Sequence, residues 1–99
     1  GKKDGARIDG NNVVYTQEFD GYTTVTLIRF NGKDVESGIS YTDYKNEDDT
    51  KKAYEALMPV GDDVKIDGTI LIQKIREDEV EAEYEGLTKE QLCSFFKWI

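Results

Sequence analysis

Four Asx-Gly dipeptides mark the places where this chain reverses direction. They are Asp9-Gly10, Asp20-Gly21, Asn31-Gly32 and Asp67-Gly68. Three of them separate runs rich in β-branched and aromatic residues, which favour strands. Asx-Gly pairs tolerate the positive φ angles of type I′ turns, whose twist matches that of paired strands. The sequence therefore predicts β-hairpins with a defined register.

The first two predicted hairpins share the strand 22–30. A two-residue loop at Asp20-Gly21 pairs Phe19 with Tyr22, and one at Asn31-Gly32 pairs Thr24 with Ile39. Side chains alternate between the two faces of a sheet, so this register separates an apolar from a polar face. The predicted inward face, under helices, collects Val13, Tyr15, Phe19, Tyr22, Ile28, Phe30, Val35, Ile39 and Tyr41. The predicted polar face collects Val14, Thr16, Glu18, Thr23, Val25, Leu27, Arg29, Glu36 and Ser40. There, Arg29 is expected to form an ion pair with Asp34.

Residues 46–58 are predicted to form a helix, capped by Asn46 and followed by Pro59 and Gly61. Its expected buried stripe is Thr50, Ala53, Tyr54, Leu57 and Met58. A further hairpin follows, from Asp62 to Ile66 and from Thr69 to Ile75. Its run Ile70-Leu71-Ile72 lacks polar alternation, which is typical of a strand that is central or covered on both sides.

Residues 77–85 fit either a half-buried strand or a short helix. The helix is favoured, because glutamate is a good helix former and Asp78 with Glu81 fits a capping box. Thr88 and Gln91 fit a second capping box at the start of a last helix. The expected apolar stripe of that helix is Leu92, Phe95, Phe96 and Ile99.

Together these elements predict an α+β fold, in which an antiparallel sheet built from β-hairpins has helices packed on one face. The predicted order is β-β-β-α-β-β-(α)-α. At 99 residues the chain is long enough for one domain, which we assign to residues 6–99. Residues 1–5 are expected to be a flexible leader.

Composition excludes several kinds of function. The formal net charge of −8 disfavours nucleic acids and anionic membranes as partners. The chain has no His, the commonest general base, and its one cysteine, Cys93, is expected to be a small, partly buried hydrophobe. We therefore predict no catalytic residues, no metal site and no cofactor.

The remaining candidates for a site are two acidic clusters, an apolar stripe of Val14, Val25 and Leu27, and Trp98. Six acids crowd into residues 77–85, and Glu47-Asp48-Asp49 opens the first helix. The first cluster is interpreted as a solvated face and the second as helix N-terminal charge, since neither spacing resembles a calcium loop. The candidate partner contacts are Trp98, Val14, Val25, Leu27, Glu81, Glu83 and Glu85. Gly38, which the predicted register pairs with Val25 inside a strand, marks a bulge or a close approach.

The order of elements resembles that of small bacterial lipoprotein domains of unknown role. The likeness rests on the two hairpins at Asp20-Gly21 and Asn31-Gly32 and on three segments. These segments are 49–57 (DTKKAYEAL), 64–69 (VKIDGT) and 84–92 (YEGLTKEQL). The resemblance implies display outside the cytoplasm, either with an N-terminal lipid anchor or without one, and a non-enzymatic role. The start at Gly1 fits a processed lipoprotein and a cloned fragment equally well.

Three functions follow as hypotheses. The first is a non-catalytic extracytoplasmic domain that acts by protein–protein interaction. The second is a cytosolic acidic inhibitor that mimics nucleic acid, which requires the acids to cluster on one face. The third is a small-ligand-binding domain, which requires a pocket lined by several polar groups.

Overall fold

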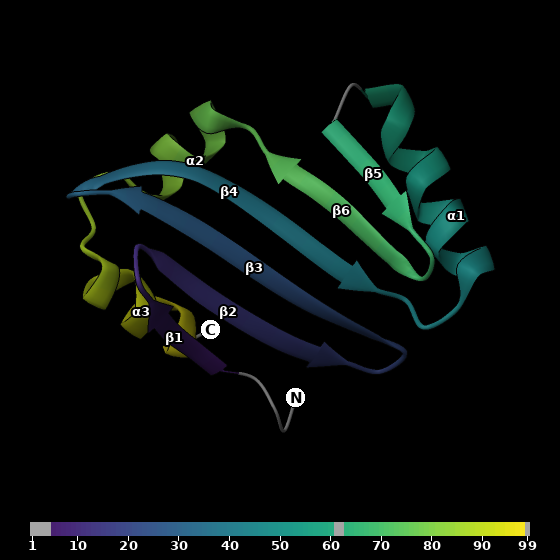
Figure 1. Ribbon diagram of the computed structural model, residues 1–99, viewed down its shortest axis with the longest axis horizontal. Helices are drawn as coiled ribbons and strands as arrows, with labels where there is room; N and C mark the ends of the chain where they lie inside the picture. The colour runs from purple at the N-terminus through teal and green to yellow at the C-terminus, as the bar shows by residue number, and fades with distance from the viewer. Residues whose placement is uncertain (1–4, 61–62, 99) are drawn as a thin grey trace.

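Six antiparallel strands form one sheet in the computed structural model, in the spatial order β1-β2-β3-β4-β6-β5 (Figure 1). The structure describes residues 5–60 and 63–98, without the side chains of Val60 and Trp98. The strands are β1 (Gly5–Asp9), β2 (Asn12–Phe19), β3 (Tyr22–Asn31), β4 (Asp34–Asp43), β5 (Asp63–Asp67) and β6 (Ile70–Ile75). The helices are α1 (Glu47–Leu57), α2 (Glu77–Tyr84) and α3 (Lys89–Trp98), with a single 3-10 turn, η1 (Met58–Val60), after α1.

The predicted α+β class is confirmed, with one strand more than expected. Gly5, assigned to the leader, is the first residue of β1, which pairs with β2 along its whole length. Residues 1–4 of the predicted leader lie outside the described part of the chain. The segment 77–85, left open between strand and helix, forms α2.

The main core lies between the sheet and helices α2 and α3. Val13, Tyr15, Ile28 and Phe30 from the sheet meet side chains of both helices there. The helical members of this core are Val80, Leu92, Cys93 and Phe96. The Tyr15 and Phe96 rings are 4.6 Å apart between centroids and tilted by 59°. Cys93 is buried in this core, as predicted.

The hairpin at Asp20-Gly21 has the predicted register, with Phe19 opposite Tyr22. The predicted type I′ geometry is wrong, because Lys45 is the only non-glycine residue of the described chain with a positive φ. At the other three dipeptides the Asx residue ends the strand and the glycine, at φ +61° to +64°, takes the first loop position. That arrangement is typical of type II′ turns.

The predicted register of β3 and β4 is wrong in two steps. The loop is Gly32-Lys33 rather than Asn31-Gly32, so Phe30 pairs with Val35. This shift of the loop by one residue would, by itself, leave every side chain on its predicted face. A β-bulge then makes Glu36 an extra residue, because Arg29 pairs with Ser37. One extra residue exchanges the two faces of a strand. Ile39 and Tyr41 therefore lie on the face that was expected to be polar.

Other local predictions have mixed outcomes. Asn46 caps α1 by accepting hydrogen bonds from the backbone N–H groups of Asp48 (2.8 Å) and Asp49 (3.2 Å). In its predicted stripe Thr50 is buried, whereas Met58 is 53% exposed because the α-helix ends before it. The capping box at the start of α3 is confirmed, since Gln91 N–H donates to Thr88 Oγ1 and Thr88 N–H donates to Gln91 Oε1. The one predicted for α2 is wrong, because its N-cap is Arg76 and no side chain caps it.

Candidate binding groove on the open face of the sheet

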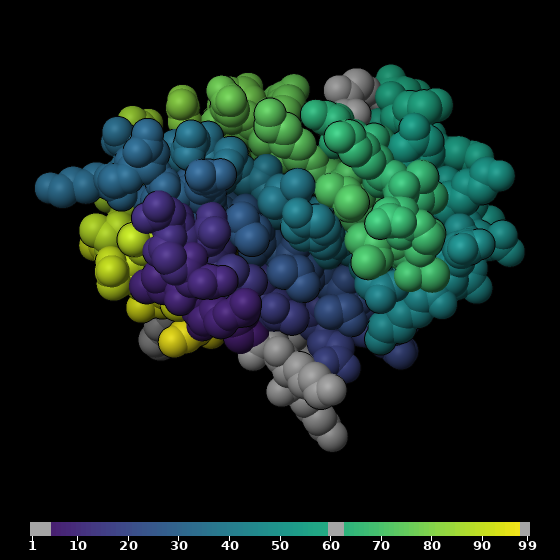
Figure 2. Space-filling view, viewed as in Figure 1, coloured from purple at the N-terminus to yellow at the C-terminus, as the bar shows by residue number. Residues whose placement is uncertain are grey.

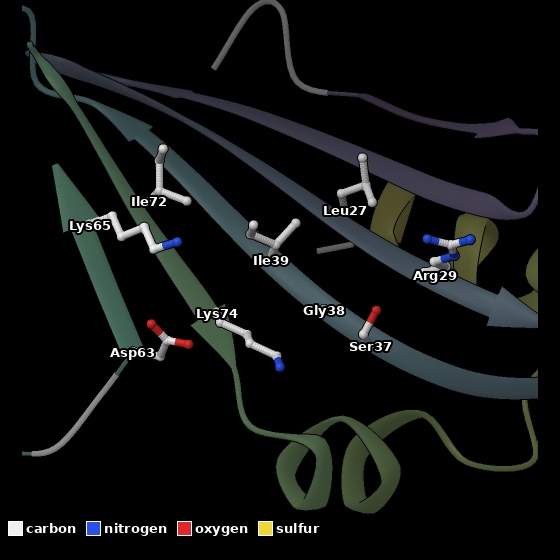
Figure 3. A pocket seen from close by; sticks show the side chains of 9 residues that line it. All are labelled: Leu27, Arg29, Ser37, Gly38, Ile39, Asp63, Lys65, Ile72 and Lys74. Carbon is white, nitrogen blue, oxygen red and sulfur yellow. The ribbon is translucent and has the colours of Figure 1, made fainter. Parts of the chain in front are cut away.

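The sheet face opposite α2 and α3, here called the open face, carries a groove of about 290 Å³. Figure 1 looks onto this face, and no helix crosses in front of β3, β4 or β6. Figure 2 shows the strand side chains that form its surface. The groove is lined by Leu27, Arg29, Ser37, Gly38, Ile39, Asp63, Lys65, Ile72 and Lys74 (Figure 3).

The floor of the groove is aliphatic and comes from three strands. Leu27 on β3 lies opposite Ile39 on β4, and Ile72 projects from the same face of β6. In Figure 3 these three side chains form a row across the sheet. Ile39 belongs to this row only because the bulge at Glu36 exchanges the two faces of the following part of β4. The bulge therefore positions the centre of the groove.

Three cationic side chains surround this floor. Arg29 lies at the β3 end of the row, and Lys65 lies at the opposite, β5 end (Figure 3). Lys74 on β6 lies opposite Asp63 on β5, which contributes the carboxylate of the groove lining. Arg29 Nε is 3.4 Å from Glu36 Oε2, so the predicted pair of Arg29 with Asp34 is replaced by a pair with the bulged residue. Among the described residues, no ion pair involves Lys65 or Lys74.

The open face is more apolar than a solvated sheet face usually is. Its aliphatic and aromatic residues with solvent access include Val25, Leu27, Ile39, Tyr41 and Ile72, and we call these five the open-face patch. An antiparallel sheet covered on one side normally shows polar residues on the other. The patch is thus partly exposed apolar surface that no described helix covers, which makes it a candidate binding surface.

Shifted pKa values occur outside this groove. Burial raises the pKa of Tyr84 to about 12, and the neighbouring Glu83 carboxylate adds to the rise. Burial also raises the pKa of Tyr44, with a smaller contribution from Tyr22. Both tyrosines make ring contacts, Tyr84 with Phe96 and Tyr44 with Tyr22, which accounts for their burial.

The predicted contact residues are scattered. Leu27 lines the groove and Val25 lies near it on the same face, but Val14 is only 6% exposed and is unsuited to bind a partner. Glu81, Glu83 and Glu85 are exposed at α2, which packs on the opposite face, and of these Glu81 lines a hollow beside the groove with Asp63 and Lys74. The side chain of Trp98 and all of Ile99 lie outside the described residues. Phe95, expected in the core, is 49% exposed.

Sequence reasoning missed most of the groove, namely Ile39, Ile72 and the three cations. One signal for it was present in the run Ile70-Leu71-Ile72, which predicts apolar surroundings on both faces of β6. The structure buries Leu71 and leaves Ile72 in the groove.

No protein-family model, curated protein or solved structure matches the chain. No helix within the described ranges is long and apolar enough to cross a membrane. Over the same ranges, no group of three or more His, Cys, Asp or Glu residues is arranged to hold a metal ion.

Proposed function

We propose that this chain is a non-catalytic binding domain that docks a partner protein on the open face of its sheet. One observation carries the proposal: β3, β4 and β6 present aliphatic side chains on a face that their own helices leave uncovered. Packing a partner against this patch would remove apolar surface from water, at roughly 25 cal/mol per Å² of area buried.

The chemistry of the groove favours recognition over catalysis. Its floor is aliphatic, and its polar rim holds three cations, one carboxylate and the Ser37 hydroxyl. Aliphatic centres with a polar rim are typical of protein interfaces. We therefore keep the prediction that the chain is not an enzyme.

Nucleic-acid mimicry receives less support. A mimic needs acids spread along one surface, in imitation of a phosphate backbone. Here the acidic first turn of α1 and the acids of α2 belong to helices at separate ends of the sheet (Figure 1). The groove between them is rimmed by cations, which a mimic would not need.

Small-ligand binding is the second candidate, and the groove itself is the observation that favours it. Its volume of about 290 Å³ lies at the lower limit of the roughly 300–1,000 Å³ that is usual for ligand pockets. Such pockets enclose most of their ligand, whereas this groove lies on an uncovered sheet face.

Location outside the cytoplasm stays a prediction from the sequence resemblance.

Site-specific photo-crosslinking in cell extract tests the proposal. Tyr41, in the open-face patch, is replaced by photoreactive p-benzoyl-phenylalanine; Phe95, exposed on α3, is replaced in the same way as a control. We expect one discrete protein adduct from position 41, none of that mass from position 95, and loss of the adduct on adding Ile72→Asp. The same adducts from both positions, or no adduct from position 41, would contradict docking on this face.

A further inference from the structure

We infer that the partner presents an acidic amphipathic helix to the groove, with an apolar stripe on Leu27, Ile39 and Ile72 and carboxylates beside the surrounding cations. The inference rests on the proposed function, and adds to it the chemistry of the docking element. Two features of the open face support it, the local charge and the arrangement of the rim.

The first feature is local charge. The whole chain carries −8, yet the groove lining holds Arg29, Lys65 and Lys74 against one carboxylate, Asp63. Within the groove the cations remain in excess even when Glu36, paired with Arg29, is included, and the α2 acids Glu77, Asp78 and Glu81 lie past Lys74 in a neighbouring hollow. A rim of opposite sign to the rest of the molecule attracts an anionic partner to this place and repels cationic ones.

The same charges argue against a second copy of this chain as the occupant. Two copies joined face to face would bring the cationic rims of their two grooves close together. Like charges in contact across an interface cost several kcal/mol. An acidic partner segment instead gives the two lysines the carboxylates that the described chain does not place within ion-pair distance.

The arrangement of the rim selects a helix as the docking element. The aliphatic row lies between Arg29 at one end and Lys65 at the other, with Lys74 beside it (Figure 3). A helix that crosses this row contacts it with residues spaced i, i+3, i+4 and i+7, and carries its polar residues on both flanks of that stripe. An extended strand places alternate residues on opposite faces, so its acids would point away from the sheet.

A peptide titration tests this inference. The probe is a fluorescein-labelled helical peptide of Leu, Ala and Glu, with leucines in one stripe and glutamates on both flanks; a matched peptide carries Gln for every Glu. Fluorescence anisotropy measures the affinity of the native chain for each. We expect the Glu peptide to bind roughly tenfold or more tightly than the Gln peptide, the sum of several weak ion pairs. This advantage should shrink as salt is raised.

Charge-reversal variants locate the site. Lys65→Glu with Lys74→Glu should weaken binding of the Glu peptide roughly tenfold or more. Lys33→Glu with Lys97→Glu makes the same change of net charge at exposed positions outside the groove, and should leave binding unchanged. If the variant with Lys65→Glu and Lys74→Glu does not fold, the neutral variant with Lys65→Gln and Lys74→Gln is used in its place. The neutral variant should also weaken binding of the Glu peptide.

The outcomes separate the inference from the proposed function. Equal binding of the two peptides, or equal loss in both charge-reversed proteins, overturns the acidic helix while docking on the patch stands. Binding of decanoate but of neither peptide also overturns it, in favour of a small amphipathic ligand. The proposed function itself is removed only by the cross-linking result: no adduct from position 41 of the otherwise native chain, or the same adducts from positions 41 and 95.

Discussion

Gly38 shows how one residue joins the two faces of the sheet. It lies on β4 between Ile28 and Ile75, and α2 crosses directly over it. A Cβ atom there would be 3.0 Å from Ile75 Cδ1 and 3.1 Å from both Ile28 Cδ1 and Val80 Cγ2. The absence of a side chain thus lets α2 approach the strand. The sequence prediction of a close approach at Gly38 is confirmed, although its predicted pairing with Val25 is wrong.

Gly38→Val should therefore lower the free energy of unfolding by about 1–3 kcal/mol, the usual cost of overpacking a core. Ile28 and Val80 are fully buried, which leaves them little room to move. Gly5→Val is the control, because no atom lies within 4 Å of the added Cβ and the φ of Gly5 is not positive. Urea unfolding should show a change of about 0.5 kcal/mol or less for Gly5→Val. Equal stability of the two variants would contradict close packing at Gly38.

At the scale of elements, two helix caps that depend on one local interaction were predicted correctly. Asn46 and the Thr88/Gln91 pair act within a few residues, and both were correctly predicted. The helix favoured for residues 77–85 is present, but its predicted capping box is wrong, because Arg76 forms ion pairs with Asp78 and Glu79 and the helix begins without a side-chain cap. β1 was missed because Ala6, Arg7 and Ile8 carry little strand signal by themselves. Pairing with β2 and contact with α3 stabilise this strand, and both are tertiary effects.

The capping box of α3 gives a prediction at this scale. Thr88→Ala should lower the free energy of unfolding by about 0.5–2 kcal/mol, since it removes the acceptor for Gln91 N–H. α3 also carries Leu92 and Phe96 into the core, so fraying of its first turn affects the packing of the whole sheet. Ser94→Ala, at an exposed site on the same helix, should cost nothing measurable. Thermal unfolding of both variants checks the difference; matching midpoints would mean that the cap is dispensable.

At the scale of the whole molecule, class and approximate order could be predicted from the sequence, but the groove could not. Hairpins and helices arise from neighbouring residues, whereas the pair Leu27 and Ile39 meets the pair Lys65 and Ile72 only after β6 pairs with β4. The bulge at Glu36 decides which face Ile39 takes. Single residues inserted into a long hairpin leave no clear pattern in a 99-residue sequence. An alternation prediction carried past such a point assigns every later residue to the wrong face.

In the whole molecule, apolar side chains occur on both faces of the sheet, but α2 and α3 cover only one of them. α2 and α3 cover one face of the sheet, while the groove on the other keeps aliphatic side chains in contact with solvent. If the open face docks a partner as proposed, Ile72 serves that partner, whereas its buried neighbour Leu71 serves the fold.

Urea unfolding of Leu71→Ala and Ile72→Thr tests this assignment most directly, because the two residues are adjacent on β6 and face opposite ways. Leu71→Ala should lower the free energy of unfolding by about 2–5 kcal/mol, because Leu71 is buried (3% exposed). Ile72→Thr keeps a β-branched side chain and should lower the free energy of unfolding by about 1 kcal/mol or less. A loss for Ile72→Thr equal to that for Leu71→Ala would show that the open-face residues serve the fold, and would contradict a surface reserved for a partner.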